Sequence, residues 1–117
     1  MDKERAVAAL AALAQENRLE VFRLLVQAGA AGIPAGRIAE TLGLPPATLS
    51  FHLTQLRHAG LVTFRREGRS LIYAAQYPTM NALLAYLTEN CCVGAPFAPP
   101  FCDPAALGQT TPETDRI

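Results

Sequence analysis

Apolar side chains recur at three- and four-residue spacing through most of residues 1–90. Because 3.6 residues complete one helical turn, this spacing predicts amphipathic helices. The first is predicted in an Ala-rich run whose apolar face comprises Ala6, Val7, Leu10, Leu13 and Ala14. The second is expected between Asn17, a suitable N-cap, and Gly29, which can end it. Its predicted buried residues are Leu19, Phe22, Leu24, Leu25 and Val26.

Two further helices are predicted on either side of a tight turn. The shorter one follows Pro34 and ends at Gly43. The longer one begins at Pro45-Pro46, because a proline in the first turn of a helix costs no intrahelical hydrogen bond. Its buried stripe has the spacing i, i+4 and i+7 and comprises Leu49, Leu53 and Leu56.

The last part of the periodic sequence predicts a hairpin and one more helix. Two β-prone runs, 61–66 and 70–74, flank Glu67-Gly68, and a helix is expected from Pro78 to about Asn90. This order of elements predicts a mainly α fold with a small β-hairpin (α+β), the winged helix-turn-helix. We expect residues 1–90 to form this domain, 91–102 a cysteine-bearing segment, and 103–117 a disordered tail.

The composition argues against several classes of protein. With 117 residues, half of them apolar, the chain is long enough for one domain with its own core. Its apolar runs are too short to cross a membrane, and no apolar signal region follows the N-terminus, so we expect a cytoplasmic protein. It has no Cys-x-x-Cys pair, Gly-rich phosphate loop or carboxylate–histidine constellation, so we do not expect an enzyme.

Charge is distributed unevenly along the chain, although the net charge is zero. Residues 37–75 contain five arginines and two glutamates, a net charge of +3. Residues 76–117 contain one arginine and four acidic residues, a net charge of −3. The basic middle favours docking of an anionic partner, and arginines that only solvate the surface are the alternative.

The predicted helix after Pro46 has an outward face suited to reading DNA. Thr48 and Gln55 can hydrogen-bond to base edges, and Phe51 can contact a thymine methyl group. His52 is expected to be structural, beside the core. Arginines near the hairpin tip suit a wing that grips phosphates and the minor groove. The predicted DNA-binding residues are Thr48, Ser50, Phe51, Gln55, Arg57, Arg65, Arg66 and Arg69.

Three runs of the sequence resemble the ArsR/SmtB family of metalloregulatory repressors. They are ALAQENRLEVFRLL at 12–25, IAETLGLPPATLSFHLTQLRHAGLV at 38–62 and REGRSLIY at 66–73. The resemblance covers about residues 5–92. It implies a homodimer, closed by the first and fifth helices, that represses by occupying an inverted-repeat operator in double-stranded DNA. The apolar residues that suit this dimer interface are Val7, Leu10, Met80, Leu83 and Leu87.

All three cysteines, Cys91, Cys92 and Cys102, fall within residues 90–102. An odd number of cysteines with an adjacent pair fits a secreted disulfide framework poorly. A disulfide between neighbouring residues would be strained, so we expect reduced thiols. Three thiolates this close in sequence suit a soft ion.

Two familiar sensor placements of the resembled family are empty, because residues 36–41 contain no cysteine and residues 78–90 contain neither Asp nor His. The cysteines instead resemble those of arsenite-responsive members that carry an adjacent pair after the last helix. The resemblance implies As(III), or Sb(III), as the inducer, held by Cys91, Cys92 and Cys102. Four alternatives stay open: methylarsenite on two thiols, zinc or cadmium with Asp103 as a fourth ligand, thiol oxidation involving Cys102, and no role.

Overall fold

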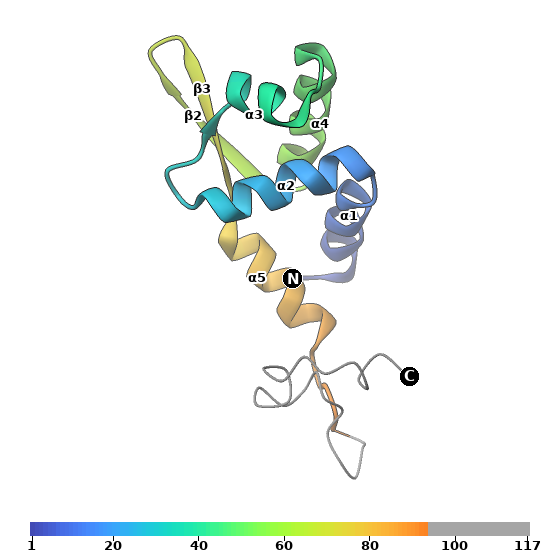
Figure 1. The fold of residues 1–117 in the computed structure, drawn as a ribbon. Coiled ribbons are helices and arrows are strands. Elements are labelled where there is room, and N and C mark those ends of the chain that lie inside the picture. The colour runs from blue at the N-terminus through green and yellow to red at the C-terminus, as the bar shows by residue number, and fades with distance from the viewer. Residues whose placement is uncertain (94–117) are drawn as a thin grey trace, which may run out of the picture. The chain divides into compact units, whose positions relative to one another are not determined.

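The computed structural model describes residues 1–93, and residues 1–87 form one compact unit (Figure 1). The predicted order of helices and hairpin is confirmed. Along the chain, the elements are α1 (Lys3–Leu13), α2 (Glu16–Ala28), β1 (Ile33–Pro34), α3 (Ala35–Leu42), α4 (Pro46–His58), β2 (Val62–Glu67), β3 (Ser70–Ala75) and α5 (Tyr77–Leu87).

The core of this unit forms where α2 and α4 pack against each other and against the neighbouring elements. The predicted stripe Leu49, Leu53 and Leu56 is buried, with exposed fractions of 2% or less. Val21 and Leu25 of α2 are also fully buried in this cluster. Each such side chain stabilises the fold by roughly 1.5–3 kcal/mol relative to an exposed position.

Helix α1 packs against the core mainly through small residues. Ala6, Ala9 and Ala12 are buried, whereas Val7 is 58% and Leu10 is 42% exposed. Alanines allow a helix to approach its neighbours closely, so the larger residues are turned outward. Val7 and Leu10, which are expected at a dimer interface, thus lie outside the core of one subunit.

The ends of two helices also differ from the prediction. The cap of α2 is Gln15 rather than Asn17, and its side-chain oxygen accepts a hydrogen bond of 2.9 Å from the Arg18 N–H. Leu19, predicted to be buried on α2, is 45% exposed. Helix α5 begins at Tyr77, whose hydroxyl donates a 2.8 Å hydrogen bond to the Val26 carbonyl, and it ends at Leu87.

The hairpin is part of a three-stranded antiparallel sheet with the order β1-β3-β2. Strand β1 has two residues, too few to produce a periodic pattern, and the sequence does not predict it. The loop before β1 is pressed against β3 at Gly32, where a Cβ atom would lie 2.5 Å from the Tyr73 carbonyl oxygen. Gly32 also has a φ of +76°, which other residues rarely adopt. This position therefore requires glycine.

None of the helices in residues 1–93 combines the length and apolar character needed to cross a membrane.

Gly32→Ala should lower the free energy of unfolding by about 1–3 kcal/mol, because it adds backbone strain and a clash with Tyr73. Denaturant titration at one fixed protein concentration measures the change. Gly36→Ala in α3 is the matched control, since its added Cβ meets nothing within 4 Å. Helix propensity predicts that this control is neutral or stabilising by up to about 1 kcal/mol. Equal unfolding free energies for wild type and Gly32→Ala would contradict the prediction.

Candidate nucleic-acid interface

The turn between α3 and α4 sets the direction of α4, the helix predicted to read DNA. Gly43 ends α3 in the left-handed conformation, and its N–H points to the carbonyls of Ala39 and Glu40. The Leu44 N–H also donates to the Ala39 carbonyl at 3.0 Å. These bonds close the end of α3, and Pro46 then occupies the first turn of α4. The predicted helix-turn-helix is thus present.

The outward face of α4 carries the predicted base-reading residues. Ser50 and Arg57 are exposed, Thr48 and Gln55 are half-buried, and Phe51 is 57% exposed. The Thr54 hydroxyl donates to the Ser50 carbonyl at 2.9 Å and is occupied within the helix. Phe51 is therefore accessible to a partner, as the predicted contact with a thymine methyl group requires.

Arg57 and Phe64 connect the reading helix to the wing formed by β2 and β3. The Arg57 guanidinium carbon lies 5.2 Å from the centre of the Phe64 ring, a cation–π arrangement. The Phe64 ring in turn lies 5.4 Å from the Tyr73 ring on β3. Arg57 is therefore positioned at the junction between helix and wing.

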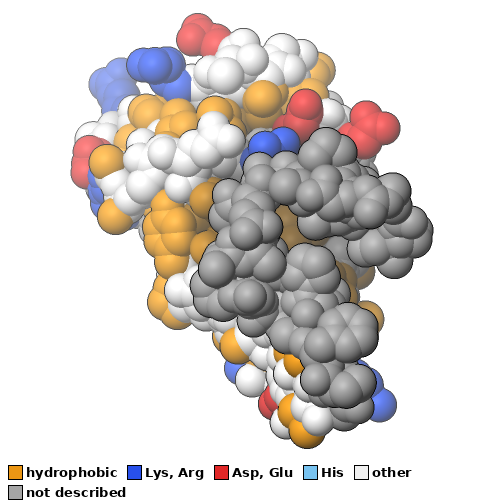
Figure 2. Space-filling model, turned by 60° about the horizontal axis from the view of Figure 1, so that its bottom comes forward, with side chains coloured by type: hydrophobic (Ala, Val, Ile, Leu, Met, Phe, Trp, Pro, Cys, Tyr) orange, Lys and Arg blue, Asp and Glu red, His pale blue; other side chains and the backbone are white. Residues whose placement is uncertain are grey.

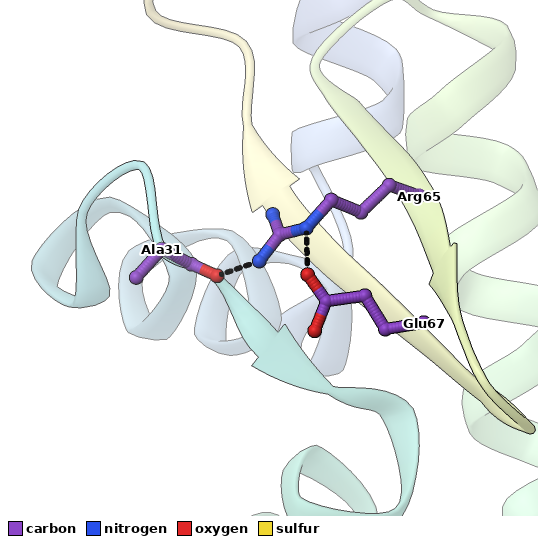
Figure 3. Close-up of polar contacts among 3 residues, drawn as sticks. All are labelled: Ala31, Arg65 and Glu67. Atoms are coloured by element: carbon purple, nitrogen blue, oxygen red, sulfur yellow. Dashed lines mark hydrogen bonds and ion pairs between the residues drawn. The ribbon is translucent and has the colours of Figure 1, made fainter.

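The three predicted wing arginines do not have equivalent environments. Arg65 donates through Nε to Glu67 Oε2 at 2.7 Å and through Nη2 to the Ala31 carbonyl at 2.9 Å (Figure 3). Arg66 and Arg69 are exposed near the tip of the hairpin. Arg65 is thus engaged within the protein, which distinguishes it from the other two.

The predicted dimer residues fall into two groups. Val7, Leu10 and Leu87 are exposed, but Leu83 is 5% exposed and belongs to the core, and Met80 is half-buried against it. Leu84, which the sequence does not single out, is 54% exposed. Figure 2, turned to bring the lower side of Figure 1 forward, shows apolar side chains gathered at the surface.

An apolar hollow of about 320 Å³ lies among α2, α5 and the end of α1. Its lining includes Leu19, Phe22, Val26, Met80 and Leu84. Together with the exposed Val7 and Leu10, this makes the side formed by the terminal helices more apolar than a fully solvated surface needs to be.

The adjacent cysteines lie in a separate unit that begins at Thr88. The Cys91 N–H donates to the Thr88 carbonyl at 2.9 Å, and Cys92 has a left-handed φ of +70°. The Sγ atoms of Cys91 and Cys92 lie 2.9 Å apart. The expectation of reduced thiols is wrong for Cys91 and Cys92, because the structure brings their sulfur atoms together and neither is a free cysteine.

The third predicted thiol cannot be placed beside this pair. Cys102 and Asp103 lie outside the described residues. Within residues 1–93, no group of three or more His, Cys, Asp or Glu side chains gathers as a metal site would require. The predicted three-thiol site therefore stays a prediction.

Sequence relatives agree with the helix-turn-helix geometry. Residues 13–64 match the family model of a helix-turn-helix domain. The chain is 30% identical over 89 residues to the HTH-type transcriptional regulator YgaV of Escherichia coli, covering 76% of this chain and 88% of that protein. It is 31% identical over 88 residues to the transcriptional activator HlyU of Vibrio cholerae, covering 75% and 79%.

Solved structures show which family of helix-turn-helix regulators the chain resembles. An ArsR-like transcriptional regulator from Rhodococcus superposes with a TM-score of 0.64 and 28% identity, over 72% of this chain and 76% of that one. The chain belongs to the ArsR family. Mb0332 from Mycobacterium bovis, a homodimeric winged helix-turn-helix domain named as a possible ArsR-family regulator, superposes with a TM-score of 0.61 and 28% identity, over 74% and 81%. A possible transcriptional regulator for arsenical resistance superposes with a TM-score of 0.60 and 26% identity, over 68% and 79%.

This membership settles the broad function. The ArsR-family chain is a DNA-binding transcriptional regulator, and the prediction that it is not an enzyme is confirmed by its relatives. The relatives include a named activator, so family membership alone leaves the direction of regulation open.

Arg18 is a residue of this ArsR-family fold whose role the sequence does not reveal. Its Nε donates to the Ala12 carbonyl at 2.7 Å, and its Nη1 approaches Nδ1 of His52 at 3.5 Å. One side chain thus connects the end of α1 with α4. Burial of His52, followed by the positive charge of Arg18, lowers the pKa of His52 below its ordinary value of 6.5. The structural role expected for His52 agrees with its 7% exposure.

Because the pKa of His52 is lowered in the folded protein, the unfolded chain binds a proton more readily. The stability that neutral His52 contributes to the fold should be fully present above pH 6.5. It should diminish as the pH falls below 6.5, because the unfolded chain then takes up the proton first. We expect His52→Gln to unfold at a temperature that depends less on pH than the wild-type temperature does, measured between about pH 5 and about pH 7. His58→Gln removes the exposed histidine of the same helix and should keep the wild-type dependence. A wild-type dependence in His52→Gln would contradict this assignment.

Proposed function

We propose that this regulator binds an inverted-repeat operator as a homodimer and represses transcription until trivalent arsenic, or antimony, binds Cys91, Cys92 and Cys102. The observation that carries the proposal is the meeting of the Cys91 and Cys92 sulfur atoms, 2.9 Å apart, just after the last helix. In this proposal the protein acts in the cytoplasm, where it meets its operator.

The dimer part of the proposal rests on the exposed apolar residues of α1 and α5. Val7, Leu10, Leu84 and Leu87 are each at least 42% exposed, and the hollow beside α5 offers a complementary surface. The related domain Mb0332 is homodimeric. A two-fold dimer places two reading helices on successive turns of the major groove, so its operator would be an inverted repeat.

Leu10→Glu should convert the protein to a monomer, because it would bury a charge in the dimer interface. Sedimentation equilibrium measures the change. Phe51→Glu is the matched control, since it places the same charge at another exposed apolar residue, on α4. This control should stay dimeric while losing DNA binding. A dimeric Leu10→Glu protein would place the interface elsewhere.

The choice of inducer rests on coordination chemistry. Trivalent arsenic and antimony are soft and pyramidal, and three thiolates fill their coordination. Structural zinc takes four ligands, as a rule from Cys and His. Two sulfur atoms already side by side need little further ordering to share one ion, provided that both are reduced. The structural relative named for arsenical resistance supports the same choice.

The proposed release works through the connection between the cysteines and α5. Cys91 follows the end of α5 by four residues, and α5 carries two of the exposed residues of the proposed dimer face. An ion that closes residues 91–102 into a loop would change how the two α5 helices pack and therefore the separation of the reading helices. DNA and metalloid would then weaken each other's binding by the same factor.

Cys102→Ser should keep DNA binding but lose release by arsenite, because only two thiolates remain. Methylarsenite, which offers two bonds, should still release this variant through Cys91 and Cys92. Release is measured by fluorescence anisotropy of a labelled duplex, in a phosphine reductant because dithiols would capture the arsenical. Thr63→Ser, a conservative change at an exposed residue of β2, is the control and should be released normally. Normal arsenite release from Cys102→Ser would exclude the three-thiol site.

A thiol-redox regulator is the second candidate, and the close approach of the Cys91 and Cys92 sulfur atoms is the observation that favours it. In that case peroxide should release the DNA and arsenite should not. Zinc or cadmium binding with Asp103 is tested in the same assay by adding those ions. A reporter gene in cells with and without the regulator distinguishes repression from activation.

A further inference from the structure

Arg65 and Arg66 point to opposite faces of the wing, because side chains alternate along a strand. Phe64 shares the face of Arg66, and this face is directed toward α4, since the Arg57 guanidinium lies over the Phe64 ring. Arg65 therefore lies on the other face of the sheet, away from the reading helix. Its neighbour on that face is Glu67, two residues further along β2.

The Arg65 guanidinium makes two directed contacts on this face. Nε donates to Glu67 Oε2 at 2.7 Å, and Nη2 donates to the Ala31 carbonyl at 2.9 Å, so that the group crosses from β2 to the loop before β1 (Figure 3). The planar guanidinium suits this double contact because its donors are held in a fixed fork.

The acceptor at Ala31 is held in place by its own loop. Gly32 is pressed against the Tyr73 carbonyl, and its N–H donates to the Gly29 carbonyl at 3.1 Å. The Ala31 carbonyl belongs to the peptide that ends at the Gly32 nitrogen. Arg65 therefore attaches the wing to a fixed point rather than to a mobile side chain.

Arg65 also lies at the point where the sheet becomes narrower. Pro34 pairs with Ile72, and Ile72 pairs with Arg65, which makes this the last row that includes β1. Beyond it, toward the tip, only β2 and β3 remain paired. A two-stranded ribbon twists more freely than a wider sheet, so a brace at this row controls the direction of the tip.

We propose that Arg65 is a positioning residue that, with Glu67 and the Ala31 carbonyl, holds the wing at its DNA-binding angle, and that the phosphate contacts of the wing are made by Arg66 and Arg69. The Arg65–Glu67 pair is about half exposed, and such pairs contribute little to global stability. Its effect is therefore expected in DNA binding rather than in folding. The proposal rests on DNA binding by the family and is independent of the inducer.

Glu67→Gln distinguishes an Arg65 that binds phosphate from an Arg65 that braces the wing, by the sign of its effect on DNA affinity. If Arg65 grips a phosphate, removing the neighbouring carboxylate frees it and reduces repulsion, so affinity should rise. If Arg65 braces the wing, the same change weakens the brace, and affinity should fall several-fold despite the more positive charge. Arg65→Lys keeps the charge but loses the fork, so it should also weaken binding.

The experiment uses the full chain and a labelled duplex that the wild-type protein enriches from a random pool. Affinity is measured by anisotropy over a range of KCl concentrations. Arg66→Gln and Arg69→Gln should each reduce the salt slope by about 0.9, the value for one lost phosphate contact. Glu67→Gln and Arg65→Lys should bind several-fold more weakly with the wild-type slope. The Gly32 amide resonance should shift in both variants, while the unfolding temperature stays close to wild type.

Tighter binding by Glu67→Gln would overturn the proposal, because it would show that the carboxylate opposes DNA. Full DNA affinity in Arg65→Lys would also overturn the proposal, since a positive charge without the guanidinium fork would then be enough for binding. Unchanged salt slopes in both Arg66→Gln and Arg69→Gln would refute the assignment of the phosphate contacts.

Discussion

The burial of one leucine stripe determines most of what this molecule presents to a partner. Leu49, Leu53 and Leu56 are almost fully buried against a core that includes Val21 and Leu25 of α2. A helix with one face held in this way has no rotational freedom left, so Ser50 and Phe51 must face outward. The Gly43 turn then sets the direction of α4. DNA reading by this regulator is in this sense a consequence of core packing, and a polar residue in the stripe would disturb the reading face before it touched DNA.

Close approach by small residues is the second constraint, and it connects the core to the surface. The alanines of α1 let this helix pack tightly, which turns Val7 and Leu10 outward, where a second subunit can bury them. Gly32 does the same for the loop before β1, which it lets reach the Tyr73 carbonyl. In both places a larger side chain would move a whole element away from its neighbour. The apolar surface of α1 and the loop before β1 therefore both depend on small residues that a partner would not contact.

The features that the sequence predicted are those with a strong local signal, and the missed ones depend on pairing across the chain. The stripe on α4, the glycine stops at Gly29 and Gly43, and the hairpin all follow from spacing and turn chemistry. Strand β1 exists because Ile33 and Pro34 find β3, and two residues carry no period of their own. Leu83 was assigned to the dimer face and belongs to the core, because α5 is apolar on nearly every side and its periodicity cannot tell the two faces apart. Arg18 had no recognisable signal, since its partners Ala12 and His52 are set by the packing of three helices.

The wing shows why counting charges is a poor guide to a nucleic-acid contact. Three arginines in five residues were predicted to act together, but strand alternation separates Arg65 from Arg66 before any tertiary contact is considered. The partner of each arginine then decides its role: Glu67 lies on the face of Arg65, and the Ala31 carbonyl is within its reach only because the loop is folded onto β3. An acidic residue two positions from a wing arginine is thus informative in its own right. In phosphate recognition it would weaken binding by repulsion, so its presence there is better explained by an arginine that is directed at the protein.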